Sequence, residues 1–441
     1  MDKKIVLIGA GSAAFGPATL MDLNQSSTLS GSTIVLHDVN KEKLDTVYDV
    51  MVVDNQKQGE KFRLEKTTKR SEALKGADFI INAIENGDRF ELRWQDNTIP
   101  RKHGSTEMMA ENGGPGGFFH SARQIPEIIK IAKDIIRTCP NALFINYSNP
   151  MSRICLALKR AAPDLKVVGL CHQIGLLTQE HLPRMLNRSL DNLELLTGGL
   201  NHFAFLLGLK DITNGKDLMP EFNLKCTQYF KDKWHRFHYA DLTFEIYKRF
   251  GYFPYVGDNH ICEYLQFGSE YTKIQDLIDW ITRMDQGNKG VNQRLMRYYK
   301  RLKRGKYPKK GMYMKELSGE RAIPIIEAIL EDKNSYEMAV NIPNDGIIEN
   351  LPQDLVIECS ARVNKSGVHG IKLGKIPKNI AALLRIEASI QDLCVEAIMK
   401  ESRELAITCL AIDVNCGSFN MAEAIFNEMF EIQKQFLPNF K

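Results

Sequence analysis

Short apolar runs alternate with amphipathic stretches along the first 200 residues of the chain. Strands that alternate with helices are typical of a parallel, doubly wound sheet with helices on both faces. Connections in such a sheet bring the loops that follow the strands to one edge, where ligands bind. The apolar runs, which predict buried strands, cover residues 4–8, 33–37, 78–83, 142–146 and 167–171. The amphipathic stretches, which predict helices, include residues 16–23, 41–58 and 121–137.

The pattern changes after about residue 200. We predict an α/β protein with a Rossmann-like, doubly wound parallel sheet in residues 1–195 and a mixed, mainly helical α+β domain in residues 196–441. No linker rich in Gly, Ser or Pro separates the two, so the sequence does not mark the domain boundary sharply. The second half is expected to contain helices at residues 241–250, 320–332 and 380–400, and strands near residues 195–209 and 338–349.

Composition excludes several classes of protein. The 441 residues include 58 Lys and Arg against 54 Asp and Glu, and this near-neutral balance argues against a nucleic-acid partner. No apolar run approaches the length of a membrane-spanning helix, and Met1 leads directly into a predicted strand, so we expect neither a membrane partner nor a signal peptide. The nine cysteines are scattered and free of CxxC spacing, which predicts a reducing, cytoplasmic location without disulfides.

A basic stretch with interleaved tyrosines covers residues 294–310. It could be a patch that binds RNA or a membrane. It could also be a solvated helix and loop whose charges balance acidic residues elsewhere in the chain. The low net charge favours the second interpretation.

A glycine motif follows the first predicted strand. In the sequence GAGSAAFG, Gly9, Gly11 and Ala14 match the GxGxxA variant of the dinucleotide-binding fingerprint. Gly9 permits a tight turn, and Gly11, followed by Ser12, lets backbone N–H groups approach a pyrophosphate at a helix N-terminus. Asp38 ends the second strand, where a carboxylate binds an adenosine ribose and repels a 2′-phosphate. The motif therefore predicts a site for NAD, with a purely structural turn as the alternative.

Two later strand ends carry residues that could do chemistry. Asn149 lies in a loop after the fourth predicted strand, where its amide would face nicotinamide or substrate. Cys171 ends the fifth strand, and His202 follows about 30 residues later. A thiolate and an imidazole suit a divalent transition metal, and two protein ligands leave positions open for substrate, as in a catalytic site. The alternative is that Cys171 and His202 are core residues.

A glycine-dense segment at residues 111–117 is interpreted as a flexible loop that lets the backbone approach a ligand closely. Arg93 and Arg123 flank this segment. Each could form a salt bridge within the protein or anchor a polar substrate.

Taken together, these segments resemble glycoside hydrolase family 4, whose members are NAD- and metal-dependent glycosidases. The resemblance runs in family order from residue 5 to about residue 415, and so covers nearly the whole chain. The matching segments are GAGSAAFG from Gly9, LRWQDNTIPRKHG from Leu92, GGPGG from Gly113, ARQIP from Ala122, NYSNPM from Asn146, GLCHQ from Gly169, GLNHF from Gly199 and SGVHGIKLGKIP from Ser366.

The resemblance implies a metal site and a reaction. Cys171 and His202 match the family's ligands of a divalent metal, usually Mn2+. In the family, NAD oxidises the sugar at C3, a base removes the acidified C2 proton, the aglycone leaves, water adds and the ring is reduced again. The family base is a tyrosine or an aspartate. We expect Asp258, with Tyr255 as the alternative, unless Asp258 only caps a turn. His260 is expected in the same pocket, where it would bind substrate.

The resemblance also bears on the substrate. Members that act on 6-phosphorylated sugars have Asn or Asp after the metal cysteine, whereas His172 follows Cys171 here. This implies an unphosphorylated α-glycoside, with His172 as the acid for the leaving oxygen or as a donor to the sugar. Because Arg pairs bidentately with carboxylates, Arg93 and Arg123, together with His260, favour an α-hexuronide such as an α-galacturonide over an α-glucoside or α-galactoside.

Two other classes compete with this interpretation. A 2-hydroxy-acid dehydrogenase of the lactate or malate type shares the predicted first domain, but it needs no metal and a shorter second half. A non-catalytic NAD-sensing protein would bind NAD without turnover of any glycoside. The resemblance favours the glycosidase, and it implies a homodimer or homotetramer.

Overall fold

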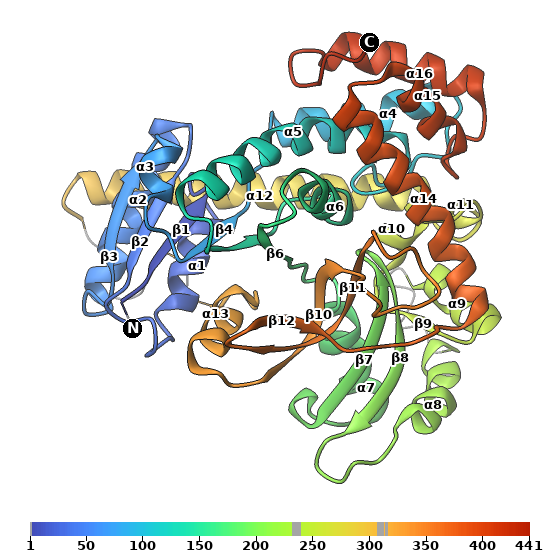
Figure 1. Cartoon of the computed structure of the whole chain (residues 1–441), viewed down its shortest axis with the longest axis horizontal. Helices are drawn as coiled ribbons and strands as arrows, with labels where there is room; N and C mark the ends of the chain where they lie inside the picture. The colour runs from blue at the N-terminus through green and yellow to red at the C-terminus, as the bar shows by residue number, and fades with distance from the viewer. Residues whose placement is uncertain (1, 232–239, 307–312, 314–315) are drawn as a thin grey trace.

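A computed structural model describes residues 2–231, 240–306, 313 and 316–441 (Figure 1). The N-terminal half forms a parallel sheet in the strand order β3-β2-β1-β4-β5-β6. Residues alternate between the two faces of this sheet. On β1, Ile5 and Leu7 join the core that holds α1 and α2, whereas Val6 and Ile8 join the core that holds α5. The strands are β1 (Lys4–Ile8), β2 (Thr33–His37), β3 (Arg63–Thr67), β4 (Phe79–Asn82), β5 (Leu143–Asn146) and β6 (Lys166–Gly169).

The edge strand β3 did not emerge from the hydrophobic pattern. Only Leu64 of its five residues is apolar, and most of the strand is exposed. Charged residues at the edge of a sheet discourage pairing with other chains, so such a strand has no apolar run to reveal it. The other five strands of this half were predicted from their apolar runs to within about two residues.

Helices cover both faces of the parallel sheet. They are α1 (Phe15–Leu23), α2 (Lys41–Lys57), α3 (Arg70–Leu74), α4 (Arg89–Lys102), α5 (Gly114–Thr138) and α6 (Met151–Ala161). Helix α5 corrects one interpretation, because the part of the glycine-dense segment from Gly114 onward forms its first turn and is buried. A Cβ atom on Gly116 would lie 2.5 Å from the Ala110 Cβ and from the Asp96 carbonyl oxygen. The glycines therefore serve close packing, and the flexible loop was a wrong prediction.

The second half extends the same sheet. Asn341 on β10 pairs with Gly169 on β6, and the order continues β10-β11-β7-β8-β9, with β12 beside β11. The sheet thus has 12 strands among the described residues. The predicted boundary after residue 195 falls inside β7. The added strands are antiparallel: β7 (Leu193–Leu200), β8 (Phe203–Asp211), β9 (Phe253–Pro254), β10 (Ser335–Pro343), β11 (Val356–Asn364) and β12 (Gly367–Gly370).

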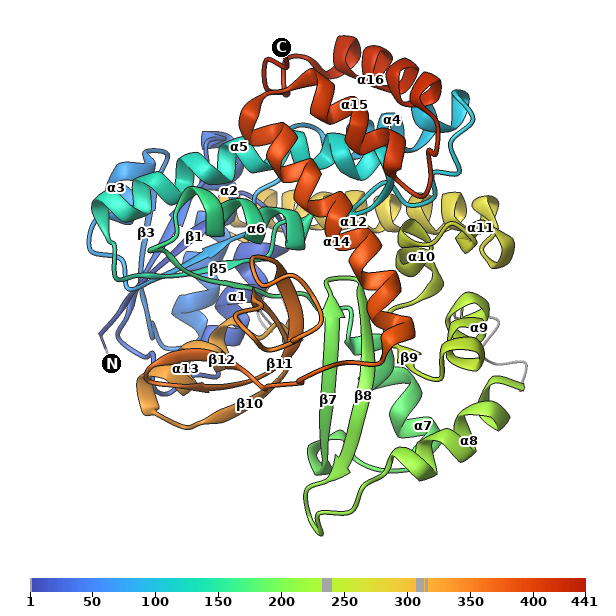
Figure 2. The same cartoon turned by 45° about the vertical axis from the view of Figure 1, so that its right-hand side comes forward.

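Helices make up much of the remaining second half. Figures 1 and 2 show the C-terminal helices, in red, beside α4 and α5 of the first half. The helices are α7 (Leu182–Leu186), α8 (Met219–Lys231), α9 (Asp241–Phe250), α10 (Asp258–Ile261), α11 (Gly268–Tyr271), α12 (Ile274–Lys303), α13 (Ala322–Glu331), α14 (Lys378–Lys400), α15 (Arg403–Ile412) and α16 (Phe419–Gln433). None of the helices in the described ranges combines the length and apolar character that crossing a bilayer requires.

The basic stretch begins on α12, which packs against α2. The Tyr298 hydroxyl donates to Asp54 Oδ1 at 3.1 Å, and Lys303 Nζ lies 2.7 Å from Asp49 Oδ2. These contacts match the interpretation in which the basic residues balance acidic ones. Residues 307–310 of the stretch lie outside the described residues.

Candidate active site

The glycine motif forms a tight turn between β1 and α1. Gly9 has a φ of +87°, and a Cβ atom there would lie 2.7 Å from the Ala83 carbonyl oxygen. The Gly11 N–H donates to Asp38 Oδ2 at 2.8 Å, and a Cβ on Gly11 would meet that oxygen at 2.7 Å. The carboxylate of Asp38 is therefore fixed against the turn, at the sheet edge where the sequence placed it.

The start of α1 shows which residue allows close helix packing. A Cβ atom on Gly16 would lie 3.3 Å from side-chain atoms of Val47 and Met51 on α2. Ala14 is exposed. The packing role that the fingerprint gives to its third glycine thus belongs to Gly16 and not to Ala14. Ser12 is also exposed, and its hydroxyl oxygen accepts from the Phe15 N–H at 3.2 Å at the start of the helix.

Cys171 and His202 lie side by side, as the sequence predicted. Cys171 follows β6, and His202 lies in the turn between β7 and β8 with a φ of +60°. The Cys171 Sγ atom lies 3.1 Å from His202 Nε2. The other ring nitrogen, Nδ1, contacts the side-chain amide of Asn112 at 2.9 Å. A positive φ is uncommon outside glycine and is often found where function constrains the backbone.

The distance between these two atoms suits two ligands of one ion. A thiolate about 2.3 Å and an imidazole nitrogen about 2.1 Å from a metal lie about 3.1 Å apart when their bonds are perpendicular. Burial raises the pKa of the Cys171 thiol, and the Glu358 carboxyl raises it further. A bound cation would favour the thiolate, since thiolate and not thiol is the ligand form.

Two further groups approach His202 closely. Glu111 lies in the segment before α5, and His260 lies on α10. One ligand atom of each residue and one ring nitrogen of His202 all lie within 4.8 Å of one another. The two imidazole rings have centroids 4.3 Å apart. Burial lowers the pKa of His260 to about 4. Burial also lowers the pKa of His202 well below its usual value. Both rings are therefore neutral. The sequence placed His260 in this pocket, but it did not single out Glu111 as a possible ligand.

The Glu111 carboxylate is held in place by charge and by its backbone. Arg93 Nη2 donates to Oε1 at 2.9 Å. Burial alone would raise the pKa of Glu111, but the charge of the Arg93 guanidinium holds it well below its usual range. The Glu263 carboxylate accepts from the backbone N–H groups of Glu111 at 2.7 Å and Asn112 at 3.3 Å.

Tyr255 and Asp258, the two candidate bases, have different surroundings. The Tyr255 hydroxyl donates to Glu358, and burial raises its pKa well above the usual value. The Asp258 carboxylate accepts from the N–H groups of Leu242 and Thr243, both at 2.9 Å, and from the Thr243 hydroxyl at 2.8 Å. Through these bonds Asp258 caps the N-terminus of the neighbouring helix α9. It does not cap a turn formed by the backbone next to Asp258. Burial raises the pKa of Asp258 to about 7.

His172 and Asn149 complete the set of predicted residues. The His172 side chain is 72% exposed, and its Nδ1 lies 3.4 Å from a Glu320 carboxylate oxygen. The Glu320 contact raises the pKa of His172. Asn149 lies between β5 and α6, and its buried Oδ1 has no hydrogen-bond partner within the described ranges. An unpaired buried acceptor in this loop suits a ligand that donates to it.

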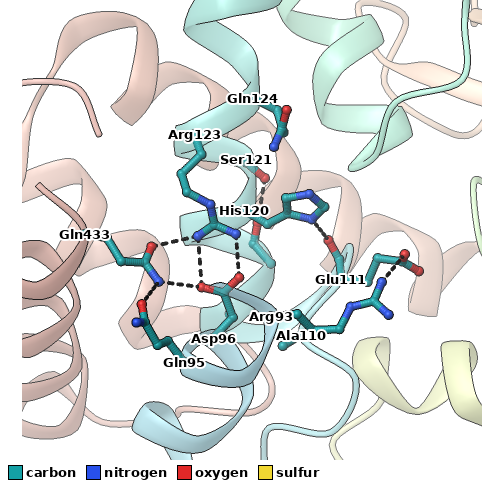
Figure 3. Close-up of polar contacts among 12 residues, drawn as sticks. Arg93, Gln95, Asp96, Ala110, Glu111, His120, Ser121, Arg123, Gln124 and Gln433 are labelled. Carbon is teal, nitrogen blue, oxygen red and sulfur yellow. Dashed lines mark hydrogen bonds and ion pairs between the residues drawn. The ribbon is translucent and has the colours of Figure 1, made fainter. Parts of the chain in front are cut away.

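Arg123 lies in a buried ion pair with Asp96 (Figure 3). Its guanidinium binds both carboxylate oxygens of Asp96, at 2.9 and 2.5 Å, and contacts the Gln433 side-chain oxygen at 2.7 Å. These contacts join α5 to α4 and α16. Figure 3 also shows Arg93 turned toward Glu111. We therefore assign Arg123 a structural role in place of the substrate contact that we expected.

Replacing Arg123 with Met is expected to destabilise the protein by about 3–5 kcal/mol, because it leaves the Asp96 carboxylate buried and unpaired. Urea unfolding monitored by circular dichroism would measure this loss. The double variant Arg123→Met/Asp96→Leu should recover much of the stability, since it removes both charges. Unchanged stability of Arg123→Met, with a raised KM for substrate, would contradict the structural role.

Known proteins resemble the whole chain. Residues 4–188 match the family 4 glycosyl hydrolases, and residues 197–416 match the family 4 glycosyl hydrolase C-terminal domain. An α-glucosidase of Erwinia rhapontici is 39% identical over 446 residues, which cover 94% of each chain. An α-galacturonidase of Thermoanaerobacter italicus is 28% identical over 457 residues, which cover 99% of this chain and 98% of that one.

Solved structures share the fold. A 6-phospho-α-glucosidase from gut microorganisms, in complex with NAD and Mn2+, has a TM-score of 0.84 at 23% identity, with 100% of both chains covered. This likeness confirms the predicted α/β fold with a Rossmann-type first half. Because the two family matches together span most of the chain, and the α-glucosidase match covers nearly all of it, the chain belongs to family 4 of the glycosyl hydrolases.

Proposed function

We propose that this family 4 glycosidase hydrolyses an unphosphorylated α-glucoside, and that it uses NAD and a divalent metal such as Mn2+. The contact of Cys171 Sγ with His202 Nε2 at 3.1 Å carries this proposal, because it supplies a thiolate and an imidazole to one ion. Asp38 beside the glycine turn supplies the ribose contact for NAD. The 6-phospho-α-glucosidase of the same fold was solved with both NAD and Mn2+.

The choice of an α-glucoside revises the preference for an α-galacturonide. That preference depended on arginines free to bind a uronic carboxylate. Arg93 is paired with Glu111 and Arg123 with Asp96, so both guanidinium groups already bind protein carboxylates. The relative with 39% identity is an α-glucosidase, whereas the α-galacturonidase is 28% identical. Membership of the glycosidase family also argues against a 2-hydroxy-acid dehydrogenase.

The chain's own residues would divide the work as follows. A metal held by Cys171 and His202 would stabilise negative charge on sugar oxygens, and NAD would supply the hydride chemistry. Asp258 removes the proton at sugar C2. Its carboxylate has about four acceptor positions, of which three are occupied by α9, so one remains for this proton. His172 donates a proton to the leaving glycosidic oxygen through Nε2, since Nδ1 faces Glu320.

Tyr255 is the weaker candidate for the base. Its hydroxyl already donates to Glu358, and a phenol with a raised pKa stays protonated. It therefore orients Glu358 beside Cys171. The Asn149 amide, with its unpaired buried oxygen, would orient the nicotinamide or the sugar.

One assay tests the proposed function. p-Nitrophenyl α-glucoside and α-galacturonide would be supplied with and without NAD, Mn2+ and a thiol reductant, and in D2O the product would be analysed for deuterium at C2. We expect cleavage of the glucoside only with NAD and Mn2+ present, and deuterium at C2. Cleavage without NAD, or without deuterium at C2, would rule out the redox-assisted route. Preferential cleavage of the galacturonide would refute the choice of sugar alone.

Replacing Asp38 with Ala is expected to weaken NAD binding by about tenfold or more, since a hydrogen bond to a charged group contributes roughly 1.5–3 kcal/mol. Discrimination against NADP should fall as well, because the carboxylate no longer repels the 2′-phosphate. Isothermal titration calorimetry with both cofactors would measure these changes. Asp45→Asn, on the outer side of α2, is the matched control. An unchanged Kd for NAD in Asp38→Ala would place the ribose elsewhere.

A further inference from the structure

Glu111 and His260 have donor atoms that the proposed reaction does not use. Arg93 binds only Oε1 of Glu111, and the second oxygen, Oε2, faces His260 Nδ1 at 3.5 Å. His260 is 2% exposed, and neither of its ring nitrogens has a hydrogen-bond partner among the described residues. A buried imidazole without a partner is costly unless a ligand satisfies it.

We propose that Glu111 and His260 bind the divalent ion directly, together with Cys171 and His202. The inference rests on the proposed function, because it assigns further ligands to the same ion. A carboxylate donor suits Mn2+, which prefers six ligands, and imidazole is a ligand of divalent transition metals. Ligand atoms of Glu111, His202 and His260 lie within 4.8 Å of one another, and Cys171 Sγ adjoins this group through its 3.1 Å contact with His202 Nε2. His260 is thus a metal ligand and not the substrate contact that the sequence suggested.

The surrounding contacts orient these donors before any ion binds. Arg93 and Glu263 fix the side chain and the backbone of Glu111. Asn112 contacts His202 Nδ1, so Nε2 is the nitrogen that faces Cys171 and the pocket. Partners of this kind set the orientation and the affinity of ligands in metal sites.

The unmodified protein loaded with Mn2+ gives the decisive measurement. Electron spin echo envelope modulation counts the imidazole nitrogens bound to Mn2+, in the absence of substrate. We expect two bound imidazoles in the unmodified protein and one in His260→Ala. A single imidazole in the unmodified protein would overturn the inference and leave the proposed function intact. Failure of the unmodified protein to bind Mn2+ would overturn both.

Affinity gives an independent readout. Free Mn2+ would be measured by electron paramagnetic resonance during titration of Glu111→Gln and His260→Ala. Since even an outer contact changes metal affinity by about 10–100-fold, we expect each variant to raise the Kd at least tenfold. The matched controls are Glu65→Gln on β3 and His369→Ala on β12, both exposed. If Glu111→Gln and His260→Ala keep the native Kd and raise only KM, these residues bind sugar and the inference is wrong.

Discussion

Replacement of Cys171 with Ala is expected to lower kcat by about 10³-fold or more, since the Lewis-acid contribution of a catalytic metal is several kcal/mol. The variant should lose Mn2+ binding while its Kd for NAD stays within about twofold. The glycine turn and Asp38 follow β1 and β2, and β4 and β5 separate these strands from β6, which precedes the thiol. Steady-state rates on p-nitrophenyl α-glucoside, with calorimetric titration of both cofactors, would measure these effects.

Cys416→Ala is the matched control, because Cys416 is also a half-buried, free thiol, and its Sγ donates to the Ser418 carbonyl oxygen. It should retain the native rate. Native activity in Cys171→Ala would mean that Cys171 is a core residue and that the metal site is misplaced.

Replacement of Asp258 with Asn is expected to lower kcat by about 10²–10⁴-fold, the range typical of a lost general base. The variant should also lose the exchange of deuterium into sugar C2, which reports on the base and not on the fold. Because the Asn amide nitrogen cannot accept a hydrogen bond from α9, stability should fall by about 1–3 kcal/mol. Rates, deuterium content and urea unfolding would be measured on the same preparation.

Tyr255→Phe separates the two candidate bases. It removes the hydrogen bond to Glu358 and leaves Asp258 in place, so C2 exchange should persist at a reduced rate. If Tyr255→Phe abolishes the exchange and Asp258→Asn retains it, Tyr255 is the base.

Much of the fold follows from local pattern, and the exceptions have physical causes. Buried strands such as β1 are continuous apolar runs, because helices cover both faces of a parallel sheet. The edge strand β3 has no such run. The glycines that begin α5 suggested a loop because glycine disfavours helices, yet close contacts of Gly116 with Ala110 and Asp96 require the missing Cβ. That requirement depends on tertiary packing, which no local pattern records.

The candidate site was predictable where residues follow strands. Cys171 and His202 were paired from their positions and from the resemblance. Glu111 was missed because its role depends on Arg93 and His260, which are distant in sequence. Arg123 was misassigned for the converse reason, since its partners Asp96 and Gln433 come from α4 and α16. The cytoplasmic location and the homo-oligomer remain predictions.

The continuous sheet means that neither half of this enzyme is a self-sufficient module. The first half alone would end in β6 with a bare edge where β10 should pair, a surface that invites association with other chains. It would also carry Cys171 without the turn that supplies His202. A recombinant fragment that stops near residue 195 should therefore aggregate. A chimera that joins the first half of one relative to the second half of another should fold only where the residues equivalent to Gly169 and Asn341 still pair.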